Sequence, residues 1–191
     1  MTDDTLIYHS IKGSPYHQRL LFEKYYKMAY TKAYSYLSNT SDTEDAVVIG
    51  FNQVFKNLKR FQKRDESSFR NWILTIIINA AIKILKSKKI SFTTNQIDTN
   101  VSIVSDDSEE IDMDSVEKIY EIMEVMPEGY RLVFIMYVIE GYRHNEIATY
   151  LDISINTSKS QLSKAKAFIR KKINSVKYEW GSEQKNGWLY Q

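Results

Sequence analysis

The fold is decided by the stretch MPEGYRLVFIMYVIEGYRHNEIATYLDISINTSKSQLSKAKAFIRKKINSV, which runs from Met126 to Val176. It opens with Pro127, a residue favoured in the first turn of a helix because its missing N–H is not needed there. Apolar residues then recur at three- and four-residue steps, which predicts an amphipathic helix. They are Leu132, Val133, Ile135, Met136 and Ile139. Gly141 ends this helix, and a short second helix follows with Ile147, Ala148 and Leu151 on one face.

A tight corner, Asp152-Ile153-Ser154, leads into a third helix for which Ser154 is a suitable N-cap. The residues expected to face inward are Ile155, Leu162, Ala165 and Ile169. Those expected on the polar outer face are Asn156, Thr157, Ser160, Gln161 and Lys164. Seven basic residues and no acidic one lie between Lys159 and Lys177. This arrangement is typical of a helix-turn-helix that reads the DNA major groove. A helical hairpin with a solvated basic face is the alternative.

This stretch resembles region 4 of the extracytoplasmic-function (ECF) subfamily of bacterial RNA polymerase sigma factors. The matching motifs are Met126-Pro127, Glu140-Gly141, Glu146-Ile147-Ala148, Asp152-Ile153-Ser154 and Thr157-Ser158-Lys159-Ser160-Gln161-Leu162. Three positions depart from the family's usual residues. Asp152 replaces a corner glycine, which is tolerable because Asp can adopt left-handed backbone geometry. Ser158 replaces an apolar packing residue, and Gln161 replaces an arginine.

Three further helices are predicted in the first half of the chain. Helical spacing of apolar and aromatic residues predicts the first over about residues 16–37. Ser41 and Glu44 have the spacing of a capping box, so the second helix should start near Asp42 and end near residue 61. After a polar loop over residues 62–68, Ser68 can cap a third helix that runs to about residue 86. No strand pattern appears, so we expect an all-α fold.

This half resembles region 2 of the same sigma-factor family. The matching motifs are Leu21-Phe22-Glu23-Lys24-Tyr25-Tyr26, Asp42-Thr43-Glu44-Asp45-Ala46-Val47, Val54-Phe55, Ser68-Phe69-Arg70-Asn71-Trp72 and Asn79-Ala80. The two resemblances imply two small helical domains, over residues 1–90 and 115–177. Residues 91–114 should form a flexible acidic linker between them, and residues 178–191 an aromatic tail without an assigned role.

Charge is strongly segregated in this chain of 191 residues, although its net charge is only +2. Residues 16–92 carry a net charge of +8, residues 93–117 one of −8, and residues 118–191 one of +3. Phosphate binding depends on local charge, so both basic blocks are candidates for nucleic-acid contact. The chain has no cysteine, no signal-peptide pattern at its start and no apolar run of the ~20 residues that span a bilayer. We therefore expect a cytoplasmic protein without direct membrane insertion.

No pattern of catalytic or cofactor-binding residues is present. The three histidines, His9, His17 and His144, are far apart in sequence and lack the spacing of metal ligands. We expect His144 to lie at the surface. No glycine-rich phosphate-binding motif occurs, and the acidic residues at the start of the second helix favour the positive end of its dipole. We therefore predict no enzymatic activity, no cofactor, no metal and no small-molecule substrate.

The resemblance implies a factor that binds core RNA polymerase, directs it to promoters and helps to melt the minus-ten DNA. The implied contacts with the clamp helices of the largest core subunit are Asp42, Glu44, Asp45, Val48 and Gln53. A flipped base is implied to enter a pocket beside the loop 62–68, and the minus-ten contacts are Lys63, Arg64, Ser67, Arg70, Asn79, Lys83 and Lys86. The minus-thirty-five contacts are Arg143, Asn156, Thr157, Lys159, Ser160, Gln161 and Lys164.

Several residues modify these expected contacts. Thr75 and Ile78 stand where the family commonly has arginine, so we expect weaker phosphate contact along a DNA-facing helix. Gln161 favours adenine where arginine favours guanine, which predicts a shifted minus-thirty-five preference. We expect Phe69 and Trp72 to be core residues rather than base-stacking platforms.

Two other classes of protein remain open. A free-standing helix-turn-helix regulator would bind duplex DNA tightly without polymerase, but the region 2 motifs argue against it. A helical adaptor that binds only protein is disfavoured by the polar face and the basic run that follows it. The resemblance also implies an anti-sigma factor as a partner that holds the protein inactive.

Overall fold

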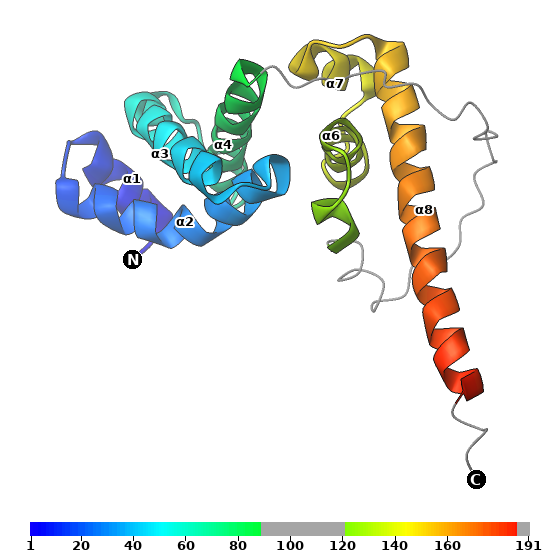
Figure 1. The fold of residues 1–191 in the computed structure, drawn as a ribbon. Coiled ribbons are helices and arrows are strands. Elements are labelled where there is room, and N and C mark those ends of the chain that lie inside the picture. The colour runs from blue at the N-terminus through cyan, green and yellow to red at the C-terminus, as the bar shows by residue number, and fades with distance from the viewer. Residues whose placement is uncertain (89–120, 187–191) are drawn as a thin grey trace. The chain divides into compact units, whose positions relative to one another are not determined.

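The computed structural model describes residues 1–88 and 121–186, with side chains as far as Ile173. All regular elements in these residues are helices, which confirms the predicted all-α fold. The chain divides into two compact units, Met1–Ile90 and Ser91–Gln191, and each is considered by itself (Figure 1). The linker expected over residues 91–114 and the end of the expected tail lie outside the described residues.

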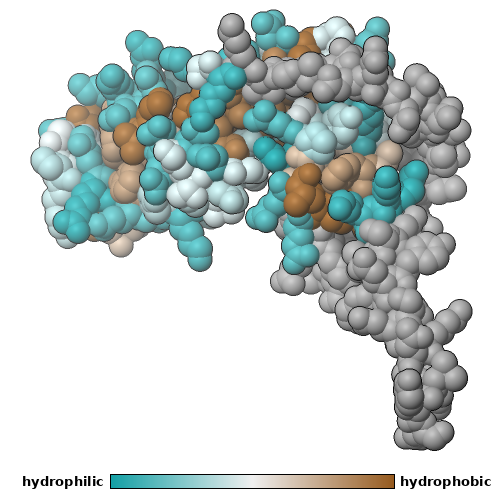
Figure 2. Space-filling model, in the orientation of Figure 1, coloured by the Kyte–Doolittle hydropathy of each residue, from teal (hydrophilic) through white to brown (hydrophobic). Residues whose placement is uncertain are grey.

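The first unit is built on α2 (Pro15–Leu37), α3 (Thr40–Asn57) and α4 (Ser68–Ser87), each of which packs against the other two. The short 3₁₀ turn η1 (Leu58–Arg60) follows α3. By length and composition α4 could cross a membrane, although the sequence predicted no apolar run of that length. Its apolar face is instead buried against α2 and α3. Much of the visible surface of this unit is hydrophilic (Figure 2).

Gly50 on α3 permits a close approach between α3 and α4. A Cβ atom at this position would lie 2.4 Å from Ile77 Cδ1 and 3.4 Å from Ile77 Cα. Ile77 is fully buried and has little room to move, since protein cores are close-packed. Any larger residue at position 50 therefore forces the two helices or the Ile77 side chain to shift.

The helix α1 (Asp3–Ile11), which was not predicted from the sequence, packs against α2 and η1. Thr2 caps its first turn and Leu6 is buried. The two carboxylate oxygens of Asp3 accept hydrogen bonds of 2.7 Å from Lys24 Nζ and the Tyr25 hydroxyl. Burial, and then the bond to Asp3, raise the pKa of Tyr25. The first turn of α1 is thus fixed to α2.

Two predicted caps are displaced along the chain. Asn39, not Ser41, caps α3, because Asn39 Oδ1 accepts a 3.0 Å hydrogen bond from the Asp42 N–H. Ser67 occupies the N-cap position of α4, and Ser68 is the first helical residue. Both helices therefore start within two residues of the predicted positions.

The second unit contains α6 (Glu128–Phe134), η2 (Ile135–Ile139), α7 (His144–Leu151) and α8 (Ile155–Asn186). η2 is a π-helix that continues α6, and its wider turn changes the angular position of the residues that follow. Ile139, expected in the core, is accordingly 46% exposed. The helix α8 continues to Asn186, beyond the expected domain boundary at residue 177.

The corner between α7 and α8 has the predicted geometry. Asp152 adopts left-handed backbone angles, with φ of 57° and ψ of 49°. Ser154 caps α8, since its hydroxyl accepts a 2.9 Å hydrogen bond from the Thr157 N–H. Ile147, Ala148 and Leu151 are buried on the inner face of α7, as expected.

Candidate nucleic-acid interface

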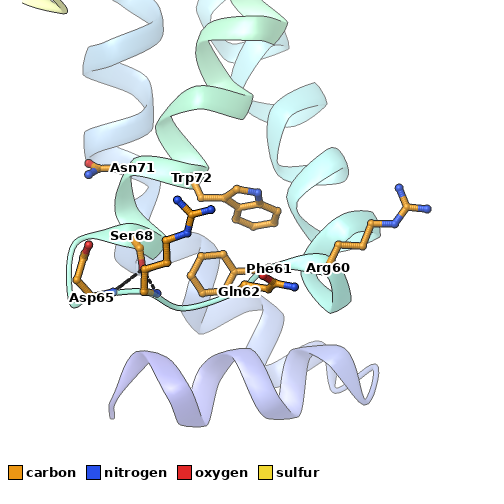
Figure 3. A pocket seen from close by; sticks show the side chains of 8 residues that line it. Arg60, Phe61, Gln62, Asp65, Ser68, Asn71 and Trp72 are labelled. Carbon is orange, nitrogen blue, oxygen red and sulfur yellow. Dashed lines mark hydrogen bonds between the residues drawn. The ribbon is translucent and has the colours of Figure 1, made fainter.

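A pocket of about 440 Å³ opens where η1, the loop that follows it and the first turns of α4 meet (Figure 3). The residues that line it are Arg60, Phe61, Gln62, Arg64, Asp65, Ser68, Asn71 and Trp72. Its volume is in the range of sites that hold a small organic group such as a nucleobase. It borders the loop 62–68, beside which the resemblance implied a base-binding pocket.

Hydrogen bonds within the loop fix the rim of this pocket (Figure 3). The Ser68 hydroxyl accepts from the N–H groups of Arg64, at 3.2 Å, and Asp65, at 3.4 Å, and donates to the Asp65 carbonyl oxygen. Asp65 Oδ1 accepts from the hydroxyl and the N–H of Ser67, both at 2.8 Å. The bond from the Ser67 hydroxyl lowers the pKa of Asp65, so its carboxylate is ionised at neutral pH.

Two aromatic rings form one wall of the pocket. The ring centroids of Phe61 and Trp72 lie 5.3 Å apart, and Figure 3 shows both rings beside the opening. Phe69 packs behind them, 4.9 Å from Phe61, and is buried. The prediction of Phe69 as a core residue is confirmed. Trp72 packs on both phenylalanine rings but is only half-buried and lines the pocket, so it is less enclosed than predicted.

An exposed polar stripe, the α4 stripe, runs from the pocket to the basic end of α4. It consists of Asn71, Thr75, Asn79, Lys83 and Lys86. The last three were predicted as minus-ten contacts. Ile78 is only 4% exposed and packs in the core. Ile78 was expected to weaken phosphate contact by replacing an arginine on a DNA-facing surface. This expectation is corrected, because position 78 faces the core and not the exposed stripe.

The other predicted minus-ten contacts are exposed but have partners within the first unit. Lys63 Nζ donates to both carboxylate oxygens of Asp4, at 2.7 and 2.9 Å, which joins α1 to the pocket loop. Arg70 Nε lies 3.2 Å from a methionine sulfur on α2. Arg64 and Ser67 belong to the hydrogen-bonded rim. Sequence spacing gave no signal for the contact between Asp4 and Lys63, which are 59 residues apart.

The outer face of α3 carries four of the five predicted polymerase contacts. Those four, which are all exposed, are Glu44, Asp45, Val48 and Gln53. Asp42 instead accepts a 2.6 Å hydrogen bond from Lys88 Nζ, which ties the start of α3 to the end of α4. Ile49, which the sequence analysis missed, is exposed beside Val48. In the described ranges 1–88 and 121–186, no group of three or more ligand-type side chains could hold a metal ion.

The outward face of α8 is rotated relative to the predicted one. Gln161 is 4% exposed and Ser158 is fully buried, whereas Ile155, expected inside, is 46% exposed. Gln161 is therefore corrected from a groove contact to an inward-facing residue, which removes the exposure on which the predicted adenine preference was based. Side-chain polarity predicted the wrong outer face, because the buried face of α8 contains two polar residues, Ser158 and Gln161.

Six exposed polar or basic residues of α8 follow a helical repeat along one face. They are Asn156, Lys159, Ser160, Ser163, Lys166 and Arg170. The first three were predicted, and the last three continue the same face one to three turns further along. Thr157 and Lys164, also predicted, are half-buried at its edges, and Arg143 is exposed just before α7. Ser163, Lys166 and Arg170 could have been predicted by continuing the helical spacing of Asn156, Lys159 and Ser160 along α8.

His144 is not the solvated surface residue that was expected. Its ring is half-buried and stacks on Tyr137, with 4.5 Å between centroids, and its Nδ1 shares a 2.9 Å hydrogen bond with Ser158 Oγ. Burial, and then the charge of Lys159, lower the pKa of His144 below its ordinary value of 6.5. The imidazole is therefore neutral at pH 7.

Comparison with known proteins gives two family matches, Sigma-70 region 2 over residues 21–90 and Sigma-70, region 4 over residues 116–169. The ECF RNA polymerase sigma-E factor of Haemophilus influenzae is 23% identical over 92% of this chain and 97% of its own length. The RNA polymerase sigma factor SigV of Bacillus subtilis is 25% identical over 74% and 81% of the two chains. A solved structure, the sigma factor RpoE in complex with the anti-sigma factor NepR from Bartonella quintana, gives a TM-score of 0.46 at 15% identity, covering 82% of this chain and 96% of that one.

Proposed function

The chain belongs to the ECF-type RNA polymerase sigma factors, non-catalytic factors that direct RNA polymerase to promoters, and we propose how its surfaces divide this work. Proteins of this family bind core RNA polymerase and promoter DNA, and they are typically cytoplasmic. The pocket beside the loop 62–68 captures a base of the opened minus-ten element. The outer face of α3 docks on the clamp helices of the largest core subunit, and the outer face of α8 reads the minus-thirty-five element.

The observation that carries this proposal is the pocket, with its aromatic wall and polar rim. Flipping a base out of the duplex costs a few kcal/mol. Stacking on an aromatic side chain recovers about 1–3 kcal/mol per base. Phe61 and Trp72 offer this stacking, and the amides of Gln62 and Asn71 can hydrogen-bond a base edge. Because the pocket binds the base only after it has flipped, it stabilises the opened DNA over the closed duplex.

The α4 stripe supports a path for the opened strand away from the pocket. Lys83 and Lys86 can neutralise phosphates, and Asn79 can hydrogen-bond a base or a phosphate. Thr75 carries no charge, and its hydroxyl donates to the Asn71 carbonyl oxygen of its own helix. The stripe therefore places its two cations at the end of α4 that is distant from the pocket.

The outer face of α3 combines acidic and aliphatic side chains, which suits a protein partner with a basic and apolar surface. Val48 is 56% and Ile49 41% exposed, and both would lose contact with water on docking. Glu44 and Asp45 on the same face would set the orientation by charge. We expect an anti-sigma factor to inhibit the protein by covering this face. Asp42, the fifth predicted contact, would have to exchange its ion pair with Lys88 for a contact with the polymerase.

At the minus-thirty-five element, the first turns of α8 would enter the major groove. Asn156 and Ser160 can read base edges, while Lys159 in the first turns and Arg170 further along the helix carry charge for phosphates. Contacts to phosphate position the helix, and contacts to bases specify the sequence. This arrangement predicts that Asn156→Ala relaxes base preference, whereas Arg170→Ala weakens binding to all sequences alike.

The first experiment mixes the full-length chain with bacterial core polymerase and measures run-off transcription from a genomic promoter library. Core-dependent initiation from promoters that share a two-element motif would support the proposal. Tight, sequence-specific duplex binding without any affinity for core would instead support a free-standing helix-turn-helix regulator.

The pocket is tested with a 2-aminopurine substituted at each position of the minus-ten non-template strand. We expect the other opened positions to become fluorescent on holoenzyme binding and the captured position to stay weaker, since an unstacked 2-aminopurine emits more strongly than one stacked on the aromatic wall. Gln62→Ala and Asn71→Ala should weaken promoter opening, whereas Tyr16→Ala, at an exposed site on α2, serves as the control. Equal opening by all three variants would exclude the pocket as the base-binding site.

A further inference from the structure

His144 joins three elements of the second unit. It stands in the first turn of α7, its ring stacks on Tyr137 of η2, and its Nδ1 shares the 2.9 Å hydrogen bond with Ser158 of α8. The two stacked rings are inclined by only 23°, so the face of the imidazole and its Nδ1 edge are both engaged. One side chain therefore connects the helix before the corner, the π-helix and the helix that carries the proposed groove contacts.

Ser158 is the buried end of this connection. It lies in the first turn of α8, fully buried, with the exposed Lys159 next to it in the chain. A buried hydroxyl that loses its hydrogen-bond partner is destabilising. The bond to His144 therefore favours one placement of Ser158 against α7. Because Ser158 belongs to the same helix as Asn156 and Lys159, this placement also sets the direction in which these two exposed side chains point.

We propose that His144 and Ser158 are positioning residues that orient α8 for reading the minus-thirty-five element. This inference rests on the proposed promoter-binding function. Neither residue contacts DNA, and both act through the exposed residues of the first turns of α8, such as Asn156 and Ser160. Groups that bind with specificity need placement within about 0.5 Å, which a loosened first turn does not provide.

The test uses the full-length chain assembled with core polymerase and two duplexes, one with the selected minus-thirty-five element and one with that element scrambled. His144→Phe keeps a ring that can stack on Tyr137 but removes Nδ1, and Ser158→Ala removes the hydroxyl. We expect each variant to lose about fivefold in the ratio of specific to scrambled affinity, the size expected of one hydrogen bond. The double variant should lose no more than either single one, since both remove the same bond.

A conservative variant separates positioning from general packing. His144→Asn places an amide nitrogen near the position of Nδ1 and should restore most of the ratio. Asn145→Ala, at an exposed site on the same helix, is the matched control, and thermal unfolding verifies that all variants remain folded. An unchanged ratio in both single variants, or an equal loss on both duplexes, would overturn the inference. A wild-type holoenzyme with no preference for any minus-thirty-five element would overturn the proposed function itself.

Discussion

The ion pair between Asp4 and Lys63 predicts that neutralising Asp4 strengthens binding of the minus-ten strand. Lys63 Nζ lies 2.7 and 2.9 Å from the two Asp4 oxygens, so a DNA phosphate must displace this carboxylate to reach the lysine. In Asp4→Asn the lysine no longer has a charged partner there, and a negative charge leaves the neighbourhood of the pocket. The pair is exposed on both sides, so its loss should have little effect on folding.

The expected size follows from the number of phosphates neutralised. One additional contact steepens the slope of log affinity against log salt by about 0.7 for a single strand. Between 50 and 200 mM salt, that slope corresponds to about a 2.6-fold additional loss of affinity. We therefore expect Asp4→Asn holoenzyme to bind a minus-ten oligonucleotide about three- to fivefold more tightly at 50 mM salt, with most of the gain lost at 200 mM.

The assay is the fluorescence anisotropy of a labelled single-stranded minus-ten oligonucleotide, titrated with holoenzyme at four salt concentrations. Glu23→Gln is the matched control, because it removes one negative charge from α2, where the partner is Arg19. Lys63→Gln in the Asp4→Asn background should abolish the gain. An unchanged affinity and salt slope in Asp4→Asn would refute the reasoning. An equal gain in Glu23→Gln would show that the loss of any negative charge raises the affinity, and not the loss of the partner of Lys63.

Three further predictions concern stability. Gly50→Ala should lower the free energy of unfolding in urea by about 1–2 kcal/mol, because overpacking against Ile77 outweighs the gain in helix propensity; equal or higher stability would contradict the close helix contact. Tyr25→Phe removes the hydrogen bond to Asp3 and should cost about 1 kcal/mol, with faster amide hydrogen exchange in α1; unaltered exchange there would count against this anchor. The pKa of His144 is lower in the folded than in the unfolded state, so the free energy of unfolding should be constant above about pH 6.5 and fall as the pH drops through the folded-state value. In His144→Asn the free energy of unfolding should not show this decrease between pH 7.5 and 5.5. If the wild-type protein and the variant lose the same stability over this range, other groups cause the decrease.

Local signals in the sequence were sufficient for most helices of the described residues. The stripes of α2, α3, α4 and α7 are strongly periodic, and the corner at Asp152 with its cap at Ser154 has the predicted geometry. The helix α1 was missed because nine residues give little periodicity. Thr2 followed by two acidic residues was an available signal, since such residues are favoured at a helix start.

Contacts between residues distant in sequence account for part of what was not predicted at the candidate site. The ion pair between Asp42 and Lys88 joins residues that are 46 apart in sequence, so no local pattern predicts it. His144 and Ser158 are 14 residues apart and polar, so hydrophobic periodicity gave no indication that they pack together. Polarity also assigned Gln161 to the wrong face of α8, because a buried amide is rare and periodicity arguments treat it as exposed.

The helix α4 has one face in the core of the first unit and carries the proposed path of the DNA strand on another. A genetic selection for defective promoter opening should therefore recover two kinds of substitution on this single helix. Changes at Ile73 or Ile77, which are fully buried, should give temperature-sensitive alleles whose promoter-opening activity returns at low growth temperature. Changes at Asn79 or Lys83 should be defective at every temperature, because they alter contacts with DNA and leave folding intact. The thermal behaviour of an allele would then identify the face of α4 that it affects.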